Sequence, residues 1–166
     1  IYNQSLKTKR GKLTIKNNKL NKFIYLSQFN YIPNRPLIEY IANSNDSEFL
    51  NQSKSFIFFL LKDSGLGEEL NIIKDQDLFK NISENAASIS GGQAQRLNIL
   101  RTIFELRLIP KKYNKILAMD EPFKGLDELS KNKFIKLLKE NAFTSILITH
   151  SKDEAYFLCE NVYEIK

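Results

Sequence analysis

Polar side chains of types that can do chemistry follow three apolar runs of the sequence, close to the point where each run ends. These side chains are Gln28, Asp120, Glu121 and His150. The runs, which have the length and composition of buried β-strands, are residues 23–26, 116–119 and 145–149. In open α/β sheets the residues that bind ligands lie just beyond the carboxyl ends of the strands. The sequence therefore predicts that these side chains lie at one working edge of a sheet.

The residue types at these strand ends suit the hydrolysis of a nucleoside triphosphate. Asp120 can hold a Mg²⁺ ion, usually through water, because hard cations take oxygen ligands. Glu121 can polarise the attacking water beside the γ-phosphate, and His150 can donate a hydrogen bond to that phosphate or hold the water in line. Gln28 can ligate the metal through its carbonyl oxygen and swing away when the nucleotide leaves. Each residue alone also fits an ordinary surface or turn position, so the interpretation depends on their shared place.

Two glycines open the helix that is predicted after Ser90 and up to about residue 108. Ser90 and Gln93 have the spacing of a capping box, which accounts for those two residues but not for the glycines between them. Each glycine inside a helix costs about 1 kcal/mol relative to alanine. A helix N-terminus offers unpaired N–H groups and partial positive charge, and Gly91 and Gly92 would let phosphate oxygens approach the backbone. The pattern predicts a phosphate-binding turn at residues 90–93.

Strand and helix patterns alternate along the second half of the chain. The expected strands are residues 12–16, 23–26, 116–119, 145–149 and 162–165, and the expected helices are residues 91–108, 129–140 and 151–159. A loosely punctuated helical stretch covers residues 37–88, with Gly65 and Gly67 as a stop. Ser151 and Glu154 have the spacing of a second capping box. Apolar strands that alternate with helices predict a parallel sheet covered on both faces.

Length and composition indicate one globular unit. The 166 residues are 42% hydrophobic and 27% charged, which suits a single domain and excludes a disordered chain. No apolar run approaches the ~20 residues of a membrane-spanning helix. The single cysteine, Cys159, excludes an internal disulfide and suits a reducing compartment. The net charge of +6 is scattered along the chain, which disfavours a nucleic-acid partner.

With these residues in place, the chain resembles the nucleotide-binding domain of ATP-binding-cassette (ABC) ATPases. The motifs stand in the family's order: the Q-loop at 25–28, the signature motif at 89–93 with Ile in place of the usual Leu, the Walker B strand at 116–121, the D-loop at 124–127 and the switch histidine at 149–150. The resemblance implies an α/β fold, with a P-loop NTPase-like, mostly parallel sheet flanked by helices and an α-helical subdomain inserted between Q-loop and signature motif. It divides the chain into an ATPase core at 1–30 and 89–166 and a helical subdomain at 31–88.

The same resemblance implies partners and cofactors. Two such domains pair head to tail and sandwich two ATP molecules with Mg²⁺, so that the signature motif of one faces the γ-phosphate held by the other and Asp127 lines the dimer interface. Glu121, His150 and Gln28 would be catalytic, while Asp120 and Gln28 would hold the metal. The helical subdomain would receive helices from transmembrane transporter subunits at the cytoplasmic face of the membrane. The expected function is an ATP-hydrolysing subunit or domain of an ABC transporter.

The chain departs from the family pattern at two places. The phosphate loop G-x-x-x-x-G-K-[S/T] is absent, because Leu6 and Leu13 flank Gly11 and Lys12 where glycine and serine or threonine should stand. We expect that the sequence is truncated at its N-terminus and that this fragment alone hydrolyses no ATP. The segment 105–115 is also several residues longer than is usual in the family.

Two other functions stay open at this point. One is a soluble ABC-type ATPase that acts on ribosomes or nucleic acid. Within that class, the short interval between Gln28 and Ser90 lacks sustained heptads, which disfavours the chromosome-maintenance branch with its long inserted coiled coil. The other is a non-catalytic remnant that only binds a partner.

Overall fold

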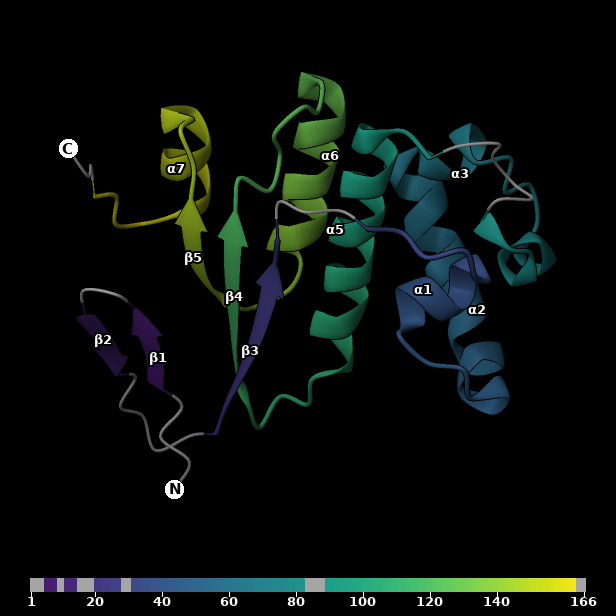
Figure 1. Cartoon of the computed structure of the whole chain (residues 1–166), viewed down its shortest axis with the longest axis horizontal. Coiled ribbons are helices and arrows are strands. Elements are labelled where there is room, and N and C mark those ends of the chain that lie inside the picture. Colours follow the sequence, from purple (N-terminus) through teal and green to yellow (C-terminus); the bar gives the residue numbers. More distant parts are fainter. Residues whose placement is uncertain (1–4, 9–10, 15–19, 28–30, 83–88, 164–166) are drawn as a thin grey trace.

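Three parallel strands form the centre of the fold (Figure 1). The computed structural model describes residues 5–8, 11–14, 20–27, 31–82 and 89–163. The strands are β3 (Asn21–Leu26), β4 (Asn114–Asp120) and β5 (Thr144–Ile148), with β4 between the other two. Leu26 pairs with Met119, and Met119 pairs with Leu147, so all three strands end at the same edge of the sheet. The predicted parallel sheet is confirmed.

Helices pack against one face of this sheet and supply much of the core. They are α5 (Gly91–Leu108), α6 (Glu128–Lys139) and α7 (Lys152–Leu158). Successive strand residues point to opposite faces, and the residues of the covered face join α5 and α6 in one hydrophobic core. Its members include Ile24, Leu26, Leu117, Met119, Leu97, Leu100, Phe134 and Leu138. Among the described helices, none combines the length and the apolar character needed to cross a bilayer.

The opposite face of the sheet is partly exposed in the part of the chain that the structure describes. Tyr25, Ile146 and Ile148 lie on this face and expose 63%, 38% and 63% of their surface. Tyr25, Ala118 and Ile146 are neighbours across the three strands. The sheet is flanked by helices as predicted, but the cover expected on both faces is incomplete at Tyr25, Ile146 and Ile148 among the described residues. An apolar run is typical of a strand buried on both faces, but it does not identify the element that covers each face.

A group of helices follows the loop after β3. It consists of α1 (Leu37–Ala42), α2 (Ser47–Ser64), α3 (Leu66–Glu69) and the 3₁₀ helix η1 (Asp75–Phe79). Asp46 caps α2 by accepting a hydrogen bond from the Phe49 amide at 2.7 Å. The helix α2 ends at Gly65, whose φ of +78° favours glycine. The predicted stop at Gly65 is confirmed, whereas Gly67 lies inside α3 and stops nothing.

Two predicted strands differ in the structure. The strand expected at 12–16 is β2 (Gly11–Thr14), which pairs with β1 (Ser5–Thr8) in an antiparallel hairpin. Residues 15–16 lie outside the described residues, and the sequence pattern did not predict β1 because Leu6 is its single apolar residue. Val162 and Tyr163 form no strand, and residues 164–165 of that predicted strand lie outside the described part of the chain.

A buried carboxylate holds the chain around η1. Asp77 accepts hydrogen bonds from the Ile73 amide at 3.1 Å and the Lys74 amide at 3.0 Å. The Lys80 ammonium donates to its other oxygen at 2.8 Å. These donors, with Lys80 first, lower the pKa of Asp77 from 3.8 to about 2.

We predict that Asp77 stabilises the fold above about pH 3.8 and loses this contribution as the pH falls towards about 2. The pKa is lower in the folded chain than in the unfolded chain, so protonation favours unfolding. Asp77→Asn should therefore lower the urea-unfolding midpoint of the complete protein at pH 7, and the difference from wild type should shrink at pH 3. Asp63→Asn, at an exposed carboxylate of α2, is the control and should change little. An equal loss at both pH values would contradict the prediction.

Candidate functional site

The structure brings Glu121 and His150 together at the ends of β4 and β5. The Glu121 amide donates a hydrogen bond to the Ile148 carbonyl at 2.9 Å, and the His150 amide donates to Glu121 Oε1 at 2.7 Å. The Glu121 side chain is 16% exposed, so its carboxylate is held in a mostly buried position at the sheet edge. An ionised carboxylate has about four lone-pair sites. One amide therefore orients the group and leaves acceptor sites for a water molecule.

The backbone of Glu121 adopts an uncommon conformation. Its φ is +46°, and the left-handed region costs a non-glycine residue of order 1–3 kcal/mol. Such strain persists only where the surrounding structure holds it, here through the hydrogen bonds to Ile148 and His150. The His150 side chain is fully exposed, and its Nε2 lies 3.8 Å from Glu121 Oε1. A ligand at this edge would meet the imidazole and the carboxylate side by side.

Asp120 ends β4 and is half-buried, directly before Glu121. Within the described ranges, no three His, Cys, Asp or Glu side chains gather into a complete metal cage. Mg²⁺ usually takes one or two carboxylates and keeps waters and substrate phosphates as its other ligands. The Asp120 carboxylate therefore fits a Mg²⁺ ion that binds together with a nucleotide. Gln28 lies outside the described residues, so its place beside the metal stays a prediction.

The first turn of α5 has accessible backbone at its two glycines. Ser90 Oγ accepts the Gln93 amide at 3.2 Å, and Gln93 Oε1 accepts the Ser90 amide at 3.1 Å, which confirms the predicted capping box. A Cβ atom at Gly91 would meet nothing within 4 Å, and one at Gly92 would lie 3.9 Å from the Gly125 carbonyl oxygen. Packing within the described chain therefore requires glycine at neither position. Small residues here keep the amides of the turn accessible, as an anion site needs.

Glu69 and Arg96 flank this turn. Arg96 Nη1 and Nη2 donate to the two carboxylate oxygens of Glu69 at 2.5 and 2.6 Å. Gln93 Nε2 also donates to Glu69 Oε2 at 3.4 Å. The hydrogen bonds from Arg96 lower the pKa of Glu69. The motifs did not predict this contact, because Glu69 precedes Arg96 by 27 residues and no pattern of adjacent residues marks it.

The turn from β4 to α6 lies against α5. The buried side chain of Gln95 donates through Nε2 to the Pro122 carbonyl at 2.5 Å. Asp127 caps α6 by accepting the Ser130 amide at 2.9 Å. Hydrogen bonds from Ser130 lower the pKa of Asp127. Asp127 therefore has a local capping function within the chain, and its place in a dimer interface stays a prediction.

Side chains also hold the turn after β5, and the sequence pattern predicts only some of their contacts. Thr149 Oγ1 donates to Glu154 Oε2 at 3.0 Å and accepts the Ser151 amide at 3.0 Å. Ser151 Oγ accepts the Glu154 amide at 3.4 Å, which confirms the serine half of the predicted capping box. The predicted reciprocal hydrogen bond, from the Ser151 amide to the Glu154 carboxylate, is wrong. The carboxylate accepts from Thr149 instead, and the Ser151 amide donates to Thr149 Oγ1. These hydrogen bonds fix Thr149, the residue that precedes His150.

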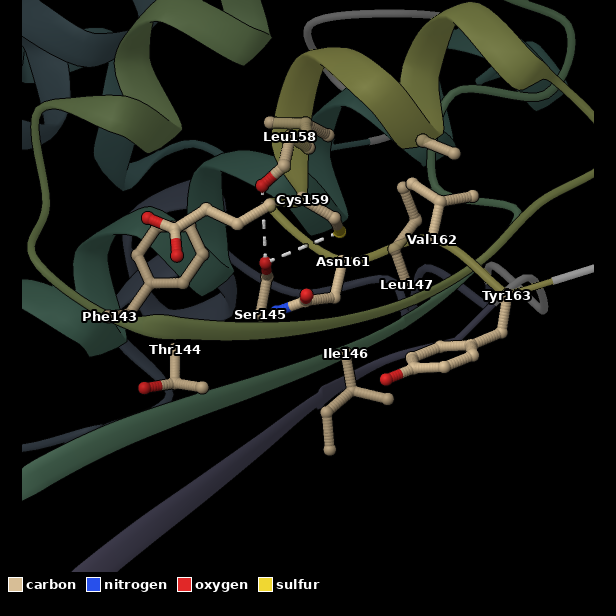
Figure 2. Close-up of a pocket in the computed structure, with 12 residues that line it drawn as sticks. Phe143, Thr144, Ser145, Ile146, Leu147, Leu158, Cys159, Asn161, Val162 and Tyr163 are labelled. Carbon is tan, nitrogen blue, oxygen red and sulfur yellow. Dashed lines mark hydrogen bonds between the residues drawn. The ribbon is translucent and has the colours of Figure 1, made fainter.

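The hollow in Figure 2 lies along β5. It has a volume of about 620 Å³ between β5 and the segment that follows α7. Ser145 Oγ donates to the Leu158 carbonyl at 3.3 Å and lies 3.6 Å from Cys159 Sγ, so it joins the strand to the end of the helix. The described residues that line the hollow include none of the predicted site residues.

Known proteins resemble this chain over most of its length, although no protein-family model matches it. It is 33% identical over 131 residues to the lacticin-481/lactococcin-DR transport/processing ATP-binding protein of Lactococcus lactis, which covers 76% of the chain and 18% of that protein. It is 27% identical over 140 residues to an aliphatic sulfonates import ATP-binding protein of Shouchella clausii, with 82% and 54% covered. A phosphate import ATP-binding protein of Borreliella afzelii is 40% identical over 98 residues, with 57% and 32% covered.

Solved structures share the fold. A bacterial Atm1-family ABC exporter with ATP bound matches with a TM-score of 0.58 at 21% identity, over 80% of the chain and 22% of that structure. A dimeric ATP-binding cassette in a post-hydrolysis state, bound to ADP and Pi, matches with a TM-score of 0.53 at 22% identity, over 82% and 56%. The fold is that of an ABC ATPase domain, an α/β fold of the P-loop NTPase kind.

The chain is a homologue of the ATP-binding proteins of ABC transporters. The resemblance to ABC ATPases is confirmed by these relatives, and the functions of the individual motif residues stay predictions. The chain spans 18% of the first relative and 54% of the second, so it corresponds to a part of each of these proteins.

Proposed function

We propose that the complete protein binds and hydrolyses ATP as the nucleotide-binding subunit or domain of an ABC membrane transporter. The observation that carries this proposal is the contact between Glu121 and His150 at the carboxyl edge of the sheet. The accessible turn at Gly91 and Gly92 also supports the proposal, because its backbone amides can bind a phosphate. The three relatives reported above carry transport or import in their names.

The described residues suit in-line attack of water on the γ-phosphate. Glu121, oriented by the His150 amide, accepts a proton from the attacking water. The His150 imidazole, exposed beside that carboxylate, donates a hydrogen bond to the γ-phosphate or keeps the water in line. Bound through Asp120 and Gln28, Mg²⁺ would neutralise the charge that develops on the phosphate oxygens.

The turn at residues 90–93 would bind the γ-phosphate of an ATP molecule held by a second copy in a head-to-tail dimer. Ser90 and Gly91 are exposed, and the space where a Gly91 side chain would stand is empty within 4 Å, so another molecule can approach the amides. Gly125 lies beside Gly92, so the turn that carries Asp127 belongs to the same surface. A dimer would bury both segments, with Asp127 at the interface.

The helices from α1 to η1 would form the helical subdomain, residues 31–88, and residues 1–30 and 89–166 would form the ATPase core. In Figure 1 this helical group lies beside α5, on the side away from β5. A β-bridge between Pro36 and Asn81 joins its first and last parts, which supports a separate unit. Transmembrane subunits or domains would dock on it at the cytoplasmic face of the membrane. The names of the relatives favour this function over the ribosome or nucleic-acid alternative.

We predict that the complete protein releases phosphate from ATP in the presence of Mg²⁺ and that this 166-residue chain alone does not. The chain contains no phosphate-loop lysine with its glycine-rich backbone cradle, and these groups hold the β- and γ-phosphates. Phosphate release by both purified proteins at equal concentration checks this. His150→Ala in the complete protein controls for contaminating ATPases and should lower turnover about tenfold or more. A complete protein without turnover would contradict the proposed function. Metal-dependent turnover by the 166-residue chain would contradict the prediction that this chain alone is inactive.

A further inference from the structure

We infer that Glu69 is a positioning residue for the phosphate-binding turn of α5, because it orients Gln93 and Arg96 and thereby fixes the backbone of residues 90–93. The inference rests on the proposed ATP-binding function of that turn and adds to it a residue that no motif contains. Glu69 is the last residue of α3 and is 40% exposed. It links the helical group to the first turn of α5.

The short helix α3 holds Glu69 in a defined place. Leu66 begins this helix and Leu70 follows it, and both are buried in the hydrophobic core at 0% and 1% exposure. A Cβ atom at Gly67 would lie 3.4 Å from the backbone carbonyl group of Leu61, so α3 packs closely on the last turns of α2. The Glu69 carboxylate therefore extends towards α5 from a firmly packed base.

Glu69 uses both of its oxygens on α5. Arg96 donates to them at 2.5 and 2.6 Å, and such a two-pronged pair fixes orientation as well as distance. Arg96 Nε also donates to the Gly92 carbonyl at 3.3 Å. The guanidinium thus connects the Glu69 carboxylate directly to the backbone of the glycine turn.

Glu69 also determines which way the Gln93 side-chain amide points. Gln93 Nε2 donates to Glu69 at 3.4 Å, while Gln93 Oε1 accepts the Ser90 amide at 3.1 Å. If the side-chain amide of Gln93 were turned by 180°, its oxygen would face the Glu69 carboxylate and its NH₂ group would face the Ser90 N–H. Neither contact is a hydrogen bond, so the turned orientation is disfavoured. Glu69 therefore supports the capping box that sets the direction of the Gly91 and Gly92 amides.

Removal of the carboxylate would loosen this turn without touching the other nucleotide contacts. Arg96, 12% exposed, would lose its charge partner, which is unfavourable for a mostly buried cation. Its guanidinium would turn towards solvent and release the Gly92 carbonyl, and Gln93 would lose its fixed orientation. Helix ends open locally with little free energy once such contacts are lost. Catalysis, which needs the turn at the γ-phosphate, should therefore suffer more than ADP binding.

The test compares Glu69→Ala with Glu68→Ala in the complete protein. Glu68 is the preceding, exposed residue of α3 and provides the matched control. In Glu69→Ala we expect amide hydrogen exchange at Ser90 and Gln93 to become about tenfold faster, because the capping box opens more often. We expect kcat for ATP to fall about tenfold and ADP affinity to stay within about twofold. Glu68→Ala should match wild type in all three measurements.

A double-mutant cycle gives the decisive comparison. Glu69→Ala and Arg96→Ala each break the ion pair and release the Gly92 carbonyl, so on a logarithmic scale the loss of kcat and the faster exchange in the double variant should be smaller than the sum of the two single effects. Unchanged exchange in Glu69→Ala, an unchanged kcat in an active protein, or fully additive effects in the double variant would overturn the inference. An equal loss of ADP affinity would indicate general unfolding and would also overturn it. Hydrogen exchange can be measured without ATP turnover. If the wild-type protein proved inactive but Glu69→Ala still accelerated exchange, the proposed function would be contradicted and the positioning of the turn by Glu69 would stand.

Discussion

Replacing Glu121 by Gln in the complete protein will lower kcat for ATP hydrolysis by about 100- to 1,000-fold, because a positioned general base contributes about that much. Gln keeps the size of the side chain, and its carbonyl oxygen still accepts the hydrogen bond that the His150 amide donates at 2.7 Å. The amide cannot take a proton from the attacking water. The variant should therefore bind ATP as wild type does and fail at the chemical step.

Steady-state phosphate release gives kcat for this variant, and equilibrium binding of ATP with Mg²⁺ gives its affinity. Glu105→Gln is the matched control, since Glu105 is an exposed carboxylate in the C-terminal part of α5. It should keep the wild-type kcat and the wild-type affinity. If Glu121→Gln retained more than about a tenth of the wild-type kcat, a difference of about 1.4 kcal/mol, Glu121 would not be the base.

Replacing Gly91 by Ala will move stability and activity in opposite directions. Alanine is favoured over glycine in a helix by up to about 1 kcal/mol, and the added Cβ atom would meet nothing within 4 Å in the chain. The unfolding midpoint should therefore rise. The same methyl group would stand in the space that the phosphate oxygens need, so kcat/KM for ATP should fall about tenfold or more.

Thermal unfolding and steady-state kinetics of the same preparations check this. Gly92→Ala should behave in the same way, because its Cβ atom would make only an ordinary contact of 3.9 Å with the Gly125 carbonyl oxygen. Glu105→Ala, far along the same exposed helix surface, should leave kcat/KM unchanged. A Gly91→Ala variant with a raised midpoint and an unaltered kcat/KM would exclude the explanation that these glycines exist for phosphate approach.

Short patterns were enough to predict the local parts of the site. The capping box of Ser90 and Gln93 formed because its two residues are three apart on one helical turn, where each side chain reaches the backbone amide of the other. The capping box at Ser151 formed only by half, because Thr149 offered Glu154 and the Ser151 amide a different partner. A pattern of spacing predicts which groups can meet, and the neighbouring turn decides which of them do.

Contacts between distant segments could not be predicted in this way. Glu69 and Arg96, like Gln95 and Pro122, are 27 residues apart, and no repeating pattern connects such positions. The exposed sheet face is a similar case. Ile146 is as apolar as the residues of the covered face, and its exposure depends on where the helices pack.

The sequence by itself determined the order of strands and helices in the central part of the chain and the residue types that follow each strand. These features depend on the periodic spacing of apolar residues and on neighbours within a few positions. Only the tertiary structure decided which sheet face the helices cover, that the His150 amide holds Glu121, and that Glu69 orients Arg96. Those contacts depend on the packing of elements tens of residues apart, where the geometry of the whole fold selects one partner among many of the same chemical type.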